Sequence, residues 1–248
     1  MSGVSIRVHD GAGPTVIYLP GIHGDWGLIG AFRRALGDKV RFVEFSYSKA
    51  DLSMEQLAEE VHSALTANGV ASGWLLGQSF GSQVGWALLA RGFKADGVVL
   101  AGGFVKHPWP WGARLFRAVL SIPGGIINPA YYGYTTLCNA LARRGPEEAE
   151  ELLSFARNRG GKDWKATTWR LSLIADFDPR ATARATRAPV HYLGGMIDPL
   201  VPWPLVTRWL KRECPGYKGE TIFPYADHNV LGSSPRESAA RVLAWVAP

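Results

Sequence analysis

Short apolar runs alternate with helically spaced segments along most of the chain. Uninterrupted apolar runs are typical of strands buried on both faces of a parallel sheet, whereas apolar residues three and four positions apart indicate a helix. These patterns predict strands at residues 5–9, 15–19, 40–47, 73–77, 97–101, 189–194 and 220–223. The alternation therefore predicts an α/β fold with a mostly parallel central sheet and helices on both faces.

Helices are predicted between or after these strands, at residues 26–36, 52–67, 80–91, 204–211 and 235–246. In the helix at residues 52–67, Leu57, Val61 and Leu65 form one apolar stripe. Ser53 is followed three residues later by Gln56, which predicts a capping box where this helix begins.

The alternation of strands and helices stops between residues 104 and 176. Aromatic and proline-rich turns at residues 107–112 lead into helical segments at 144–157 and 163–173. We therefore predict one domain, with a core of residues 1–103 and 177–248 and a helical cap inserted at 104–176. We expect the aromatic side chains of this segment to pack within the cap. If they faced the site, the substrate pocket would be apolar. They are Trp109, Trp111, Phe116, Tyr131, Tyr132 and Tyr134.

Composition excludes several classes of protein. The 248 residues are 47% hydrophobic and 19% charged, as in an ordinary globular protein. No apolar run approaches the roughly 18 residues of a membrane span, and the first ten residues carry no signal-peptide core. We therefore expect a cytoplasmic protein with no transmembrane segment. Two isolated cysteines, Cys138 and Cys214, predict free thiols and no metal site.

Positive charge is concentrated in the middle of the chain. The formal net charge is +6, and residues 104–187 alone hold 13 Lys/Arg against 7 Asp/Glu. A solvated surface explains such an excess, and so does attraction of an anionic substrate, carrier or membrane surface. Nucleic-acid binding is not expected, because no Lys/Arg run or nucleic-acid motif accompanies the charge.

The sequence Gly77-Gln78-Ser79-Phe80-Gly81 is the strongest candidate for chemistry. It has the form G-x-S-x-G, with an apolar strand before it and a helix after it. In that setting Ser79 stands on a sharp strand-to-helix turn with its hydroxyl exposed as a nucleophile. Five residues alone match often by chance in a chain with 29 glycines, so the flanking elements carry the interpretation.

A serine nucleophile needs an imidazole to accept its proton and a carboxylate to orient that imidazole. Asp198 follows the predicted strand at 189–194, and His228 follows the strand at 220–223. Carboxyl ends of parallel strands share one edge of the sheet, so Ser79, Asp198 and His228 can converge there. Asp176 and Asp178 are alternative acids, but they precede the strand at 189–194 and are disfavoured.

These motifs and their order resemble the α/β-hydrolase superfamily, specifically its small serine esterases with a helical cap. The backbone N–H of Phe80, at the start of the helix, is the first expected oxyanion donor. The resemblance implies a second donor in the loop after the strand at 15–19, where Pro20-Gly21-Ile22 places it at Ile22. Aligning His23-Gly24-Asp25 there is the alternative. Two departures are Gln78 and Pro20, which stand where many relatives carry histidine.

The resemblance implies hydrolysis of a carboxylic ester or thioester through an acyl-serine, without a metal or an organic cofactor. Rival reactions on the same scaffold are those of acyltransferases, hydroxynitrile-lyase-like enzymes and carbon–carbon bond hydrolases. A non-catalytic ligand-binding protein is a further alternative, although such a protein is expected to lack a triad member.

The remaining polar candidates have simpler interpretations. Pocket lining is considered for His23, Gln78, Trp109 and Trp111, and His23 could equally pack its own loop. Asp25 and Asp227 are expected to cap loops. Four other histidines are expected to be structural or exposed to solvent, because none follows a core strand at the right place. These are His9, His62, His107 and His191.

Overall fold

The central sheet has seven strands. The computed structural model describes residues 3–109, 111–112, 114, 118, 127–142 and 144–247. Its strands are β1 (Ser5–His9), β2 (Thr15–Leu19), β3 (Arg41–Ser46), β4 (Ser72–Gln78), β5 (Lys94–Ala101), β6 (Val190–Gly195) and β7 (Tyr217–Phe223). They lie in the order β1-β3-β2-β4-β5-β6-β7. Only β1, at the edge, pairs antiparallel among them, which confirms the predicted mostly parallel sheet.

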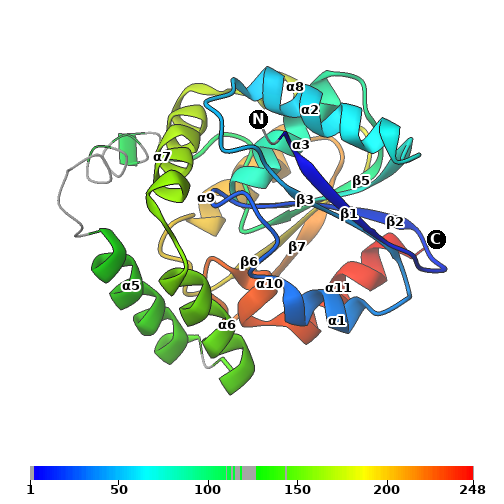
Figure 1. The fold of residues 1–248 in the computed structure, drawn as a ribbon. Helices are drawn as coiled ribbons and strands as arrows, with labels where there is room; N and C mark the ends of the chain where they lie inside the picture. The colour runs from blue at the N-terminus through cyan, green and yellow to red at the C-terminus, as the bar shows by residue number, and fades with distance from the viewer. Residues whose placement is uncertain are drawn as a thin grey trace.

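Helices cover both faces of this sheet (Figure 1). They are α1 (Gly30–Leu36), α2 (Met54–Ala67), α3 (Phe80–Ala90), α5 (Ile127–Leu141), α6 (Pro146–Arg157), α7 (Gly161–Asp176), α8 (Arg180–Ala185), α9 (Trp203–Glu213), α10 (Val230–Ser233) and α11 (Pro235–Val246). In Figure 1, α2, α3 and α8 lie on one side of the strands, and α1, α10 and α11 on the other. The predicted fold class is therefore confirmed.

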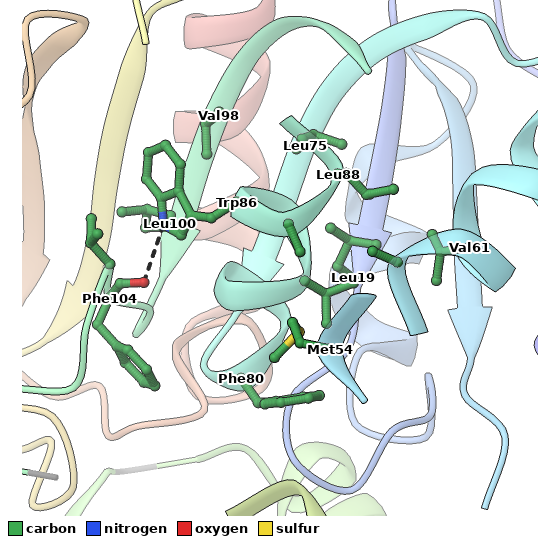
Figure 2. Close-up of a cluster of buried hydrophobic side chains, with 14 of the residues drawn as sticks. Leu19, Met54, Val61, Leu75, Phe80, Trp86, Leu88, Val98, Leu100 and Phe104 are labelled. Atoms are coloured by element: carbon green, nitrogen blue, oxygen red, sulfur yellow. Dashed lines mark hydrogen bonds between the residues drawn. The ribbon is translucent and has the colours of Figure 1, made fainter. Parts of the chain in front are cut away.

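Two hydrophobic cores result from the alternation of side chains along each strand. In β2, Ile17 and Leu19 face the core shared with α2, α3 and α9, whereas Val16 and Tyr18 face the core shared with α1 and α11. Figure 2 shows the first core around α3, where the indole Nε1 of Trp86 donates a hydrogen bond to the Phe104 carbonyl at 3.2 Å. β4, the strand that precedes Ser79, is likewise packed on both faces, since Leu75 lies in the first core and Leu76 in the second.

The predicted capping box of α2 is present, with Gln56 N 3.2 Å from Ser53 Oγ. Several element boundaries, however, differ from the predicted ones. α1 begins at Gly30 and not at residue 26. Asp25 Oδ1 accepts a hydrogen bond from Gly27 N at 2.9 Å in the turn before it, and Glu151 of α6 accepts one from Gly30 N at 3.1 Å where the helix begins. β7 begins three residues earlier than predicted, and the short helices α8 and α10 were not predicted.

The segment between β5 and β6 contributes α5, α6 and α7, which lie together beside the sheet in Figure 1. α5 packs on α6, and α7 contacts α3. The described part of residues 104–176 contains no strand. The division into core and cap remains a prediction. Within the described residues, no helix is long and apolar enough to cross a membrane, and no cluster of three potential metal-binding side chains occurs.

Candidate active site

Ser79 connects β4 directly to α3 in an unusual backbone conformation. Its φ of 50° and ψ of −118° make it the one non-glycine residue with positive φ in the described part of the chain. Such a conformation costs free energy and is kept only where the surrounding structure enforces it. Gly81 permits the sharp turn, since a Cβ there would lie 2.0 Å from the Leu19 carbonyl oxygen.

Three side chains form a hydrogen-bonded chain at the carboxyl edge of the sheet. His228 Nε2 lies 2.8 Å from Ser79 Oγ, and His228 Nδ1 lies 2.8 Å from Asp198 Oδ2. Asp198 follows β6 and His228 follows β7. The imidazole is thus placed to exchange a proton with the hydroxyl while the carboxylate fixes its orientation.

Asp198 is held by backbone groups as well as by the imidazole. Its Oδ1 accepts hydrogen bonds from Leu200 N at 2.8 Å and Val201 N at 2.9 Å, and its side chain has no exposed surface. The alternative acids lie elsewhere. Asp176 pairs with Arg114, and the Arg180 guanidinium on Asp178 lowers the pKa of that carboxyl to about 2.

The environment of His228 favours its protonated form. Burial lowers the pKa of the imidazole, but the charge and hydrogen bond of Asp198, with the charge of Asp227, outweigh this and raise the pKa above 6.5. The positive charge that the ring acquires on accepting a proton is therefore stabilised.

The loop after β2 passes beside the strand-to-helix turn at Ser79, which we call the elbow. A Cβ on Gly21 would lie 3.6 Å from both Ser79 Cβ and the Gln78 carbonyl oxygen. Gly24 N donates to the Gly21 carbonyl at 2.8 Å, which closes a turn over residues 21–24 that contains Ile22 and His23. We call this segment the 21–24 turn. Phe80 is the first residue of α3, and an N–H at that position has no acceptor within the helix.

Arg170 of α7 was not identified from the sequence. The side chain is 4% exposed and donates to the carbonyls of Ile22 and Ser48, each at 2.9 Å. These carbonyls belong to the loops after β2 and β3. No local pattern marks an arginine with such distant partners.

Gln78 lies behind the elbow. Its amide oxygen accepts a hydrogen bond from the Tyr18 hydroxyl, and its Nε2 donates to Asn229 Oδ1 at 2.6 Å. The amide therefore links β2 and β4 to the residue that follows His228. Gln78 is 6% exposed, and pocket lining by this residue remains a prediction.

His23 packs against residues of the predicted cap. Its ring makes edge-to-face contacts with Phe155 and Trp164, at centroid distances of 5.3 and 6.1 Å. Burial, followed by the charges of Arg159 and Arg170, lowers the pKa of His23 to about 3, so the ring is neutral at pH 7. These contacts give His23 a packing role, and pocket lining by this residue remains a prediction.

The aromatic residues proposed for the pocket are incompletely described. Trp109 and Trp111 are 43% and 65% exposed, and pocket lining by them remains a prediction. Phe116 and the side chains of Tyr131, Tyr132 and Tyr134 lie outside the described part of the structure.

Two loop carboxylates have the predicted capping role and additional partners. Asp227 Oδ1 accepts from Asn229 N at 2.9 Å, while its Oδ2 pairs with Arg144 at 2.7 Å. Asp25 caps the turn at Gly27 and pairs with Arg159. The two arginines follow α5 and α6, so each pair joins the segment between β5 and β6 to the rest of the fold.

The other histidines are mostly structural. His191 stacks on Trp245 with 4.5 Å between ring centroids. His107 belongs to the segment that leaves the carboxyl end of β5, and its ring meets Phe104 edge-to-face at 4.9 Å between centroids. Burial lowers the pKa of His107, and the charge of His228 lowers it further. The two rings therefore lie within electrostatic range of each other.

Comparison with known proteins agrees with the observed fold. A model of the alpha/beta hydrolase family matches residues 16–241. "Putative carbamate hydrolase RutD" of Cronobacter turicensis is 31% identical over 183 residues, which are 69% of this chain and 63% of that protein. A hydrolase from Pseudomonas aeruginosa superposes with a TM-score of 0.82 at 17% identity, covering 99% of this chain and 94% of that one. An esterase from Thermogutta terrifontis gives 0.78 at 19% identity, covering 98% and 92%. The chain belongs to the alpha/beta hydrolase family.

Proposed function

We propose that this hydrolase cleaves a carboxylic ester or thioester through an acyl-serine intermediate. The observation that carries the proposal is the chain of two 2.8 Å contacts from Ser79 Oγ through His228 to Asp198. A hydroxyl, an imidazole and a buried carboxylate in this arrangement are the parts that acyl transfer to serine requires.

In the acylation half, Ser79 Oγ attacks the substrate carbonyl carbon while His228 Nε2 takes the hydroxyl proton. Asp198 stabilises the imidazolium that forms. The N–H groups of Phe80 and Ile22 stabilise the negative charge on the carbonyl oxygen, which is worth on the order of 3 kcal/mol for one such donor. The tetrahedral intermediate then collapses, and His228 gives the proton to the leaving alcohol or thiol.

In the deacylation half, water attacks the acyl-serine carbonyl. His228 accepts the proton of the water and returns one to Ser79 Oγ as the acyl–oxygen bond breaks. The carboxylic acid leaves, and the hydroxyl of Ser79 is restored. The same oxyanion donors and the same imidazole serve both halves.

The Ser79→Ala variant tests this proposal. It should lower the kcat for p-nitrophenyl acetate by about 10⁴-fold or more, because removing any triad member leaves only binding and oxyanion stabilisation. The matched control is Ser63→Ala on α2, which lies in an exposed setting and should keep the wild-type rate. Wild-type kcat in Ser79→Ala would exclude the acyl-serine route.

Carbamate hydrolysis is a second candidate, favoured by the name of the Cronobacter turicensis relative. The same attack on a carbamate carbonyl would give a carbamoyl-serine. Comparing kcat/KM for an ester and a carbamate with the same leaving group decides between them: an ester preference supports our first proposal.

An anionic substrate is proposed from the basic excess in residues 104–187. Some of these cations are neutralised by carboxylates outside that segment, since Lys165 pairs with Asp51 and Arg184 with Glu213. Two carboxylates of the segment, Glu147 and Asp163, are in turn paired with Arg34 and Lys49 outside it, so the excess is only partly offset. If acidic and neutral esters of equal length show the same salt dependence of kcat/KM, the anionic preference is rejected.

A further inference from the structure

We propose that Arg170 is a positioning residue that holds the 21–24 turn in the conformation needed for the oxyanion donor at Ile22. The inference rests on the proposed function and adds to it a residue from α7, outside the hydrogen-bonded chain of Ser79, His228 and Asp198. Arg170 acts through the backbone of the turn and need not touch the substrate.

The first support is the pair of hydrogen bonds that the guanidinium makes. It donates to the carbonyl oxygens of Ile22 and Ser48, at 2.9 Å each. A planar guanidinium presents its donors in a fixed geometry, so it sets the spacing of the two carbonyls. The carbonyl of Ile22 therefore has a defined direction. The N–H of Ile22 belongs to the preceding peptide group, whose Gly21 carbonyl accepts a hydrogen bond from Gly24 N at 2.8 Å. Arg170 thus constrains this N–H through the φ and ψ of Ile22, while the turn's own hydrogen bond holds the other side.

The second support is the fit between the turn and the guanidinium. Gly24 has a φ of +77°, and a Cβ on it would lie 2.4 Å from Arg170 Nη1. The carbonyl of Gly24 accepts a hydrogen bond from Tyr47 N at 2.7 Å. One end of the turn is thus tied to the backbone after β3, and Arg170 holds the carbonyl at Ile22.

The third support is a contact toward the other oxyanion donor. Arg170 Cζ lies 5.6 Å from the ring centroid of Tyr47, and the Tyr47 ring meets Phe80 edge-to-face at 6.2 Å. Arg170 therefore contacts Ile22 directly and reaches Phe80 through one aromatic ring.

The cost of burying Arg170 argues against a purely packing role. Burial lowers the pKa of the guanidinium to about 10, so it stays charged at pH 7. Among the described residues no carboxylate forms an ion pair with it, and backbone carbonyls are its hydrogen-bond acceptors. Trp169, one position earlier, shows that α7 can be tied to the core without a charge, since its Nε1 donates to the Leu52 carbonyl at 2.8 Å.

The test compares Arg170→Met and Arg170→Lys with the control Trp169→Phe, which removes a bond between α7 and a carbonyl outside the 21–24 turn. Loss of an oxyanion donor lowers kcat by about 10²–10³-fold. We expect its misplacement in Arg170→Met to lower kcat by about 10- to 100-fold, with KM within about twofold of wild type. Arg170→Lys keeps the charge but not the paired donors, so its kcat should lie between those of the wild type and Arg170→Met.

Binding of a trifluoromethyl ketone separates positioning from general damage. Ser79 Oγ adds to the carbonyl carbon of this inhibitor. The oxyanion that results lies between the N–H groups of Phe80 and Ile22. Its inhibition constant should rise by the factor by which kcat/KM falls in each Arg170 variant. In Trp169→Phe both quantities should stay within about twofold of wild type. If Arg170→Met does not fold, judged by circular dichroism, Arg170→Lys carries the comparison.

Three outcomes would overturn the inference: wild-type kcat in the folded Arg170 variants, an equal loss in Trp169→Phe, or a rise in KM with kcat unchanged. Failure of the proposed function has a different signature. In that case the wild-type protein itself would not form an adduct with the ketone at Ser79.

Discussion

At the scale of single residues, the elbow depends on what surrounds Ser79 as much as on the serine. The positive φ of Ser79 is maintained because β4 is fixed within the sheet, α3 packs on that sheet, and the helix approaches β2 closely at Gly81. None of these conditions concerns the hydroxyl. The geometry of the nucleophile is therefore a property of the fold that can be tested through stability.

Gly81→Ala tests that close approach. The new Cβ would stand 2.0 Å from the backbone oxygen of Leu19, which cannot move without shifting β2. We expect the free energy of unfolding in urea to fall by about 2–4 kcal/mol. Gly85→Ala on the same helix is the control. Its Cβ would meet only side-chain methyl groups, those of Leu19 at 3.4 Å and Leu75 at 3.9 Å, and alanine favours the helix by about 1 kcal/mol. Equal losses in both variants would contradict this account of the elbow.

The pH dependence of kcat/KM should reflect the raised pKa of His228. Only the neutral imidazole can accept the proton of Ser79, so activity should fall as the pH is lowered, with a midpoint above 6.5. Asp198→Asn removes the charge that raises this pKa. The midpoint should then move to lower pH, and kcat should drop by about 10³–10⁴-fold. A midpoint that is unchanged in Asp198→Asn would exclude Asp198 as the partner of His228.

The sequence could place Ser79, Asp198 and His228 at one edge because each follows a predicted strand, and strand ends converge in a parallel sheet. It could not identify Arg170, or the bonds of Gln78 to Tyr18 and Asn229. These contacts join residues that are distant in the chain, and their side chains carry no local signal.

At the scale of elements, Arg144 joins the segment between α5 and α6 to the loop that carries His228. The side chains of Arg144 and Asp227 are 1% and 5% exposed. Breaking a buried ion pair leaves a charge without a partner, which typically costs about 3–5 kcal/mol. This pair therefore stabilises the position of α5 and α6 against the loop before His228.

Arg144→Met should accordingly lower the free energy of unfolding in urea by about 3–5 kcal/mol. Arg34→Met is the matched control, because Arg34 pairs with Glu147 on α6 with both side chains mostly exposed. Exposed pairs contribute about 0–1 kcal/mol. A loss below about 1 kcal/mol in Arg144→Met would show that the ion pair does not hold these elements together.

Element boundaries show where local patterns stop being sufficient. The range of α11 was predicted correctly because Pro235 marks its first turn. The start of α1 was not, because the N–H of its first residue, Gly30, is capped by Glu151 of α6 at 3.1 Å, a partner far away in the chain. β7 was predicted too short because all of its residues are partly or fully exposed, so its polar half gave no apolar run.

At the scale of the whole molecule, the basic segment and the rest of the fold are electrostatically matched. Arg144, Arg159, Lys165 and Arg184 pair with carboxylates outside residues 104–187. In return, Glu147 and Asp163 of this segment pair with Arg34 and Lys49 outside it, so these ion pairs offset only part of the basic excess. The fold class followed from the alternation of elements, whereas the arrangement of α5, α6 and α7 depends on such long-range pairs.

The central claim is that Ser79 becomes covalently acylated. The most direct measurement is mass spectrometry of the wild-type protein and of Ser79→Ala after treatment with a fluorophosphonate, followed by mapping of the labelled peptide. We expect one adduct, on Ser79, at a rate that falls with the acid limb of the kcat/KM profile, and no adduct in the variant. An unlabelled Ser79 in active wild-type protein, or an equal adduct in Ser79→Ala, would contradict the account.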